Sequence, residues 1–201
     1  MAFARRPCLE KTAKLSILFG QGQTVGAQVL VESAEDAALV GAAREGDRAA
    51  FGQLYERYAR VVHGVLLSRV PPNDVEDLVQ DVFLNAWRRL RTLRDDSAFG
   101  AWLAAIARNH AADHHRRPAV HEEVHEDLPA KDREQPEALA ILVAIQSLPD
   151  AYRETLILRL VEGFSGAEIA ARTGLTHGSV RVNLHRGMQQ LREKLGKRNG
   201  L

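Results

Sequence analysis

The stretch SGAEIAARTGLTHGSVRVNLHRG, residues 165–187, predicts two short helices joined at a glycine. Ser165 and Glu168 have the spacing of a capping box, in which each side chain accepts a hydrogen bond from the backbone N–H of the other residue. Gly174 permits the left-handed backbone at which many helices end. Thr176 is placed to cap the second helix. This pattern predicts a helical hairpin and favours an all-α fold.

The second helix of the hairpin has one apolar face and one basic, polar face. Apolar residues recur at spacings of three and four, as a buried helical stripe requires: Val180, Leu184, Met188, Leu191 and Leu195. The opposite face carries His177, Ser179, Arg181, Asn183, His185 and Arg186. Arginine can donate two hydrogen bonds to guanine and an amide can pair with adenine, so this face suits the major groove of DNA. The alternative is a helical hairpin with a solvated face, because helix–glycine–helix units are common.

Helical spacing also runs through residues 35–117. Gly46 interrupts one helix, and Asp47 is placed to cap the next. Asn73 and Glu76 have the spacing of a capping box for a third helix. These residues predict a bundle of helices that precedes the hairpin in the chain.

The helix predicted over residues 74–90 has an unbroken apolar stripe, which indicates a strongly amphipathic element. Its opposite face carries Asp77, Gln80, Asp81 and Asn85. A polar, net acidic strip suits a basic protein partner, for which it provides steering and register. The alternative is a solvated face on a core helix.

A polar loop at residues 92–97 separates this helix from the next, and Ser97 is placed to cap a helix that ends near Pro118. Trp102 shares a face with Phe99 and Ile106, so we expect it in the core.

The charge is divided unevenly along the 201 residues, although the formal net charge is only +1. Residues 118–137 carry seven acidic and two basic groups together with three prolines, which is typical of a flexible linker. Residues 150–201 carry nine basic and five acidic groups, so phosphate contact is expected there. We predict a flexible extension over 1–34, a helical bundle over 35–117, an acidic linker over 118–137 and a four-helix, helix-turn-helix domain over 138–201.

Composition argues against several other classes of protein. No apolar run reaches the roughly 18 residues of a membrane span, so we expect a cytoplasmic protein without membrane insertion. Cys8 is the only cysteine, which excludes an internal disulfide. Histidines are dense at His110, His114, His115, His121 and His125. Because no carboxylate–histidine arrangement with a pocket-forming loop accompanies them, we expect no metal site, no cofactor and no enzymatic activity.

Three stretches carry a resemblance to a known family: DVEDLVQDVFLNAWRRL (74–90), SAFGAWLAAIARNHAADHHRR (97–117), and SLPDAYRETLILRLVEGFSGAEIAARTGLTHGSVRVNLHRGMQQLREKL (147–195). In this order, with an acidic linker between the second and third, they resemble the bacterial sigma factors of the extracytoplasmic-function class, in the sigma-70 family of RNA polymerase subunits. The resemblance covers about residues 35–117 and 138–196. It implies a transcription initiation factor that binds core RNA polymerase and opens promoter DNA.

The resemblance also implies roles for single residues. The strip of Asp77, Gln80, Asp81 and Asn85 would dock on core RNA polymerase. The minus-ten promoter element would be contacted by Arg94 and Ser97 in the loop, by Asn109 at a pocket for a flipped base, and by Arg108, Arg116 and Arg117 on phosphates. The minus-thirty-five element would be contacted by His177, Ser179, Arg181, Asn183, His185 and Arg186.

Two departures from the family pattern bear on the base preference of the second helix of the hairpin. Val182 stands where many relatives carry serine, and His185 where some carry an aromatic residue. The family further implies an anti-sigma partner. A free-standing helix-turn-helix regulator, with residues 35–117 as a sensor or dimerisation module, and a histidine-based metal enzyme are the alternatives.

Overall fold

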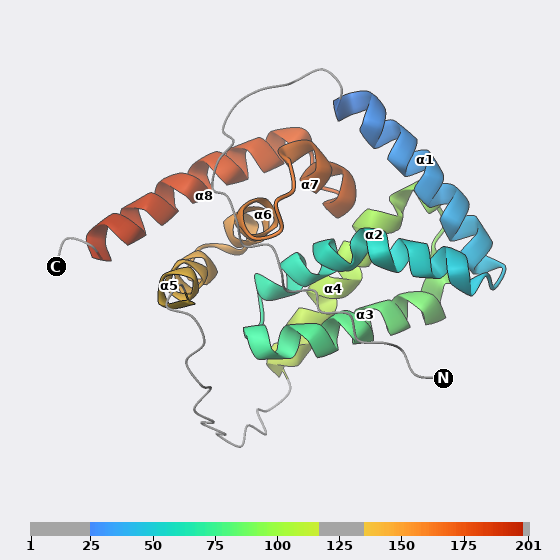
Figure 1. Cartoon of the computed structure of the whole chain (residues 1–201), viewed down its shortest axis with the longest axis horizontal. Coiled ribbons are helices and arrows are strands. Elements are labelled where there is room, and N and C mark those ends of the chain that lie inside the picture. Colours follow the sequence, from blue (N-terminus) through green and yellow to red (C-terminus); the bar gives the residue numbers. More distant parts are fainter. Residues whose placement is uncertain (1–24, 117–134, 199–201) are drawn as a thin grey trace.

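The computed structural model describes residues 25–116 and 135–198, and within them all regular structure is helical. The first half of the chain forms the helices α1 (Val25–Arg44), α2 (Arg48–Leu67), α3 (Val75–Arg89) and α4 (Phe99–Arg116). Three short 3-10 turns, Pro72–Asp74, Leu90–Thr92 and Asp96–Ala98, connect α2 to α3 and α3 to α4. The second half forms α5 (Gln135–Gln146), α6 (Asp150–Leu160), α7 (Gly166–Thr173) and α8 (His177–Arg198) (Figure 1). The predicted all-α fold is confirmed.

Helix α1 begins at Val25, ten residues before the predicted boundary at Glu35. Its Asp36 is buried and accepts hydrogen bonds from the Tyr58 hydroxyl at 2.6 Å and from Arg57 at 2.8 Å, both on α2. Burial and the neighbouring Asp36 carboxylate raise the pKa of Tyr58, so the phenol stays a hydrogen-bond donor. This contact fixes α1 against α2.

The local caps follow the sequence at one helix and depart from it at another. Asp47 accepts hydrogen bonds from the backbone N–H groups of Ala49 and Ala50, as expected of a cap for α2. The predicted capping by Asn73 is wrong, because α3 starts at Val75 after a 3-10 turn. The two prolines at 71–72 explain the difference. Pro71 is extended and Pro72 begins the turn, so Asn73 already lies inside it.

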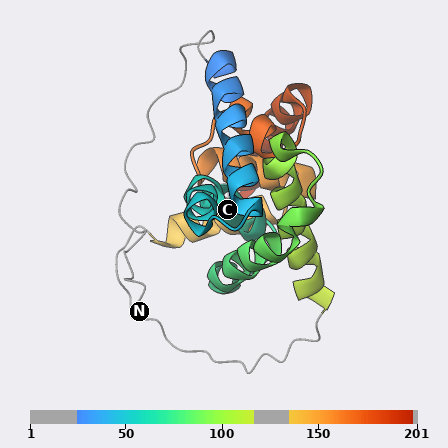
Figure 2. The same ribbon diagram turned by 90° about the vertical axis from the view of Figure 1, so that its right-hand side faces the viewer.

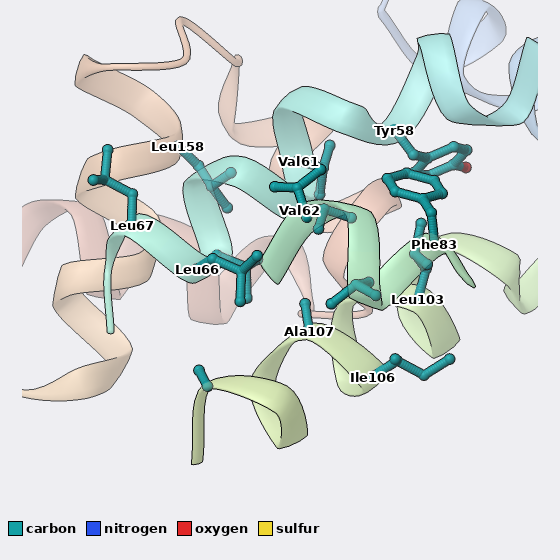
Figure 3. Close-up of a cluster of buried hydrophobic side chains, with 14 of the residues drawn as sticks. Tyr58, Val61, Val62, Leu66, Leu67, Phe83, Leu103, Ile106, Ala107 and Leu158 are labelled. Atoms are coloured by element: carbon teal, nitrogen blue, oxygen red, sulfur yellow. The ribbon is translucent and has the colours of Figure 1, made fainter. Parts of the chain in front are cut away.

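The core of the first half lies between α2, α3 and α4 (Figure 3). Val62, Leu66 and Leu103 are almost completely buried there. Trp102 is half-buried and packs against the edge of this core, with its ring 6.0 Å from the Phe99 ring, so its expected position in the core is confirmed only in part.

The hairpin of α7 and α8 follows the sequence prediction closely. Ser165 and Glu168 form the reciprocal capping box, with hydrogen bonds of 3.2 and 2.8 Å. Gly174 ends α7 at φ 75°, a left-handed backbone. The Thr176 hydroxyl accepts the Ser179 backbone N–H at 3.1 Å and so caps α8.

The two halves of the chain pack against each other, an arrangement that the sequence did not predict (Figures 1 and 2). The predicted linker lies almost wholly outside the described residues, but α6 packs on α2 and α7 packs on α4. Leu158 of α6 is fully buried (Figure 3). It lies beside Gly64 of α2, where a Cβ atom would approach within 2.7 Å of the leucine. Gly174 likewise brings the α7 end close to Ala101 of α4. Small residues therefore permit close approach of the two halves.

Candidate nucleic-acid and protein interfaces

The outer face of α3 presents the predicted polar strip to solvent. Asp77, Gln80 and Asp81 are exposed, whereas Asn85 is half-buried and its amide lies 2.8 Å from the His110 ring nitrogen of α4 in a hydrogen bond. The structure adds Leu84, which is 52% exposed and lies one turn after Gln80 and Asp81. An exposed leucine among acidic and amide groups makes this strip a candidate protein-binding surface. Its signal in the sequence was an apolar residue outside the buried stripe.

The loop before α4 is held from behind by α1. The Arg44 guanidinium donates to the Leu93 carbonyl at 3.0 Å and forms an ion pair with Asp96. Asp95 accepts the backbone N–H of Ser97 at 3.0 Å and its hydroxyl at 2.6 Å, and these bonds lower the pKa of the Asp95 carboxyl. Ser97 therefore bonds to Asp95 within the loop, while α4 begins at Phe99.

The predicted minus-ten residues of this loop and of α4 lie in different settings. Arg94, Ser97 and Asn109 are exposed. Arg116 is exposed at the end of α4, and Arg117 lies outside the described residues. Arg108 instead donates to both carboxylate oxygens of Glu154 in α6, at 3.0 and 2.6 Å. In this arrangement the Arg108 guanidinium is bound by a carboxylate from the second half of the chain.

The predicted DNA-reading face of α8 is open. His177, Ser179, Arg181, His185 and Arg186 are exposed, and Asn183 is half-buried. A shallow hollow of about 520 Å³ opens between the beginnings of α7 and α8 and is lined by Gly166, Ala167, His177, Gly178, Val180, Arg181 and Leu184. Val182, which departs from the family pattern, is 43% exposed on the same helix. The helix therefore presents basic and amide groups at its N-terminal half, as insertion into a major groove requires.

The histidines of α4 have separate partners. The His114 ring lies 3.2 Å from an Asp74 carboxylate oxygen, and the His115 ring donates to the Arg69 carbonyl at 2.7 Å. Within residues 25–116 and 135–198, no three histidine, cysteine or acidic side chains are grouped to hold a metal ion. His121 and His125 lie outside this part of the chain.

None of the described helices is long and apolar enough to span a membrane.

Comparisons with known proteins agree with this architecture. Residues 54–119 match the family model of sigma-70 region 2, and residues 138–191 match that of sigma-70 region 4. The chain is 31% identical to the ECF RNA polymerase sigma-E factor of Haemophilus influenzae, over 83% of this chain and 98% of the relative. It is 34% identical to the sigma-E factor of Escherichia coli, over 82% of this chain and 96% of the relative.

Among solved structures, CnrH in complex with the cytosolic domain of CnrY is similar at a TM-score of 0.60 and 28% identity, with 81% of this chain and 98% of that chain covered. Family models thus match both halves in the expected order, and the relatives align over nearly their whole length. The protein therefore belongs to the extracytoplasmic-function sigma factors, which bind core RNA polymerase and direct promoter recognition.

Proposed function

We propose that the chain docks on core RNA polymerase through the outer face of α3. The observation that carries this proposal is the exposed strip of Asp77, Gln80 and Asp81 around Leu84, on the side of the helix opposite the buried stripe. Acidic side chains steer a basic partner and fix its register, and the leucine supplies apolar contact at the centre. Asn85 contributes at the edge of the strip, where its bond to His110 fixes its orientation.

The two promoter elements would be contacted by separate surfaces. Arg94 and Ser97 in the loop before α4, with Asn109 on that helix, would surround a base taken out of the stack, because an amide can hydrogen-bond a splayed base edge. Arg108, Arg116 and Arg117 would hold backbone phosphates of the same region.

The outer face of α8 would enter the major groove at the minus-thirty-five element. His177, Ser179 and Arg181 lie nearest its N-terminus, where base contacts of recognition helices concentrate. Asn183, His185 and Arg186 would extend these contacts along the groove.

The functional units would be residues 35–117 and 138–201, joined by the acidic segment 118–137. The factor would act in the cytoplasm. It would need no enzymatic activity, because binding energy alone opens the promoter. CnrH was solved with the cytosolic domain of CnrY, and we expect that this chain also has a protein partner, an anti-sigma factor.

Run-off transcription with purified core RNA polymerase tests the docking surface. Asp81→Arg reverses a charge in the strip and should weaken polymerase binding by about 2–5 kcal/mol, since charge reversal in a complementary interface is strongly unfavourable. Fluorescence anisotropy of labelled protein titrated with polymerase gives the affinity, and transcript yield gives the activity. Glu56→Arg is the matched control, an exposed charge reversal on α2. Normal binding and transcription by Asp81→Arg would refute the docking assignment.

A further inference from the structure

Two arginines of the first half converge on one carboxylate of the second. Glu154 of α6 is only 3% exposed, and it accepts two hydrogen bonds from Arg108 of α4 at 3.0 and 2.6 Å. Arg69, just after the end of α2, donates a third at 2.7 Å. Burial alone would raise the pKa of Glu154, but the bonds and charges of Arg108 and Arg69 lower it. The group is therefore an ionised carboxylate held in a fork of two guanidinium groups.

The acceptors that the structure gives these two guanidinium groups all come from the second half. Arg69 also bonds Asp150 at 2.9 Å, one turn before Glu154 on α6. Arg108 also donates to the Thr173 carbonyl at the end of α7, at 3.3 Å. Withdrawal of α6 and α7 would therefore remove two negative charges and a carbonyl together. It would leave two adjacent cations without these acceptors.

The chemistry of such a pair selects an oxyanion. Guanidinium groups bind phosphate as well as carboxylate, because both anions present oxygen pairs that match the planar fork of donors. Arg108 also precedes Asn109, which is exposed on the open face of α4. The site therefore lies at the edge of the surface proposed to hold the minus-ten element.

We propose that Arg69 and Arg108 form a binding site for a backbone phosphate of nucleic acid, and that Glu154 occupies this site when the two halves are packed together. The inference rests on the proposed function, since promoter DNA is taken as the natural source of the phosphate. Arg108 was already predicted to hold a phosphate, whereas Arg69 was not among the predicted DNA-binding residues. The packed arrangement and phosphate binding at this site exclude each other, because the same donors serve both.

Binding of the full-length chain to a fluorescein-labelled, single-stranded oligothymidine tests the site by fluorescence anisotropy over a salt series. Glu154→Gln removes the internal competitor and leaves two half-buried cations short of a counter-charge, so it favours separation of the halves. We expect affinity at low salt to rise about tenfold. The slope of log K against log salt should steepen by about 0.7 for each phosphate that is newly bound.

Glu162→Gln is the matched control. Glu162 is a second buried carboxylate at the same interface, where it accepts hydrogen bonds from Arg60 and His63 of α2, so its loss leaves the partners of Arg69 and Arg108 in place. We expect it to raise affinity much less than Glu154→Gln. Adding Arg69→Gln and Arg108→Gln to the Glu154→Gln chain should abolish the gain.

Four results would overturn the proposal. These are an unchanged affinity in Glu154→Gln, an equal gain in Glu162→Gln, a gain that persists without both arginines, and equally strong binding of polyglutamate, which would mean that the site takes an acidic protein segment. Circular dichroism verifies folding.

A second measurement keeps the wild-type Glu154 and uses the holoenzyme. Arg69→Gln should lower the salt dependence of promoter binding by about one unit of slope without weakening polymerase binding. An unchanged slope would also overturn the proposal. If wild-type protein fails to support run-off transcription while the oligothymidine results hold, the proposed function fails and the phosphate site stands.

Discussion

The outer face of α8 and the covered edge of α4 both present arginines that we expect to contact DNA, but in opposite settings. Arg181 and Arg186 lie exposed on α8, on the side away from the core. Arg108 of α4 forms a bidentate ion pair with Glu154 at the interface between the halves. In the packed arrangement, the outer face of α8 is accessible to a DNA duplex. The edge of α4 is partly covered, because Glu154 of the same chain binds Arg108.

The difference indicates that packing of α6 and α7 on α2 and α4 covers part of one proposed DNA-binding surface and leaves the other open. Leu158 of α6 belongs to the same cluster of buried apolar side chains as Val62 and Leu66 of α2, which favours one structural unit. The ion pairs of this interface are exchangeable, because DNA can supply the same oxyanions. Stability and DNA binding should therefore respond to different substitutions on the two surfaces.

The largest effect should come from the apolar part of the interface. Leu158→Ala should lower the free energy of unfolding by about 2–5 kcal/mol, because it leaves a cavity beside Gly64 at a fully buried position. Urea denaturation followed by circular dichroism measures this. Leu84→Ala is the control, and at an exposed position it should change stability by no more than about 0.5 kcal/mol. Equal stability of the Leu158→Ala and wild-type chains would show that the halves do not pack through α6.

A paired substitution of arginines separates binding from stability. Arg181→Ala should weaken binding of the holoenzyme to a promoter by about 1–3 kcal/mol through a lost base contact, and leave the unfolding free energy unchanged. Arg108→Ala should lower the stability of the free chain, because Glu154 loses two hydrogen bonds at a buried position. Promoter footprinting and urea denaturation provide the two measurements. If the two variants show the same changes in promoter binding and in unfolding free energy, the distinction between the open face of α8 and the covered edge of α4 is wrong.

Acid should weaken the ion pairs of Glu154 at the interface between the two halves, and so lower the stability of the chain. The pKa of Glu154 is lowered in the folded chain from its ordinary value of 4.5, so its stabilisation is complete above that value and is lost as pH falls through the lower, folded-state pKa. Each unit of lowering contributes about 1.4 kcal/mol at neutral pH. Urea denaturation at neutral pH and below 4.5 should show this loss. The Glu154→Gln chain should lose less stability over the same range, and an identical pH profile in the two chains would contradict the assignment.

Local structure was predictable wherever a few neighbouring residues determine it. The capping box at Ser165, the left-handed Gly174 and the cap at Asp47 depend on residues within a few positions, and the structure contains each of them. The cap at Asn73 was predicted wrongly because the preceding prolines impose their own turn. The start of α1 was also missed, since the first turns of that helix carry only weak apolar periodicity.

Contacts between distant parts of the chain could not be predicted in this way. Glu154 lies 46 residues from Arg108 and 85 from Arg69, and no local pattern pairs them. Gly64 and Gly174 gave no signal that a helix from the other half would approach them. The exposed faces of α3 and α8 were identified because helical periodicity separates outward from inward residues. The covered edge of α4 was identified only in part, because its partners come from the other half.

The smallest effect on stability and DNA binding is expected at the N-terminal cap of α7, the helix that supports α8. Ser165→Ala removes the hydroxyl that accepts the Glu168 N–H, and should lower the free energy of unfolding by about 1 kcal/mol. Because α7 packs against both α8 and α4, weakening its first turn should reduce minus-thirty-five binding less than Arg181→Ala does. Thr176→Ala, which removes the cap of α8 itself, is the comparison. If α7 serves mainly as support, Thr176→Ala will reduce DNA binding more than Ser165→Ala at a similar loss of stability. The reverse order would place the hairpin's first helix, and not its second, in direct contact with DNA.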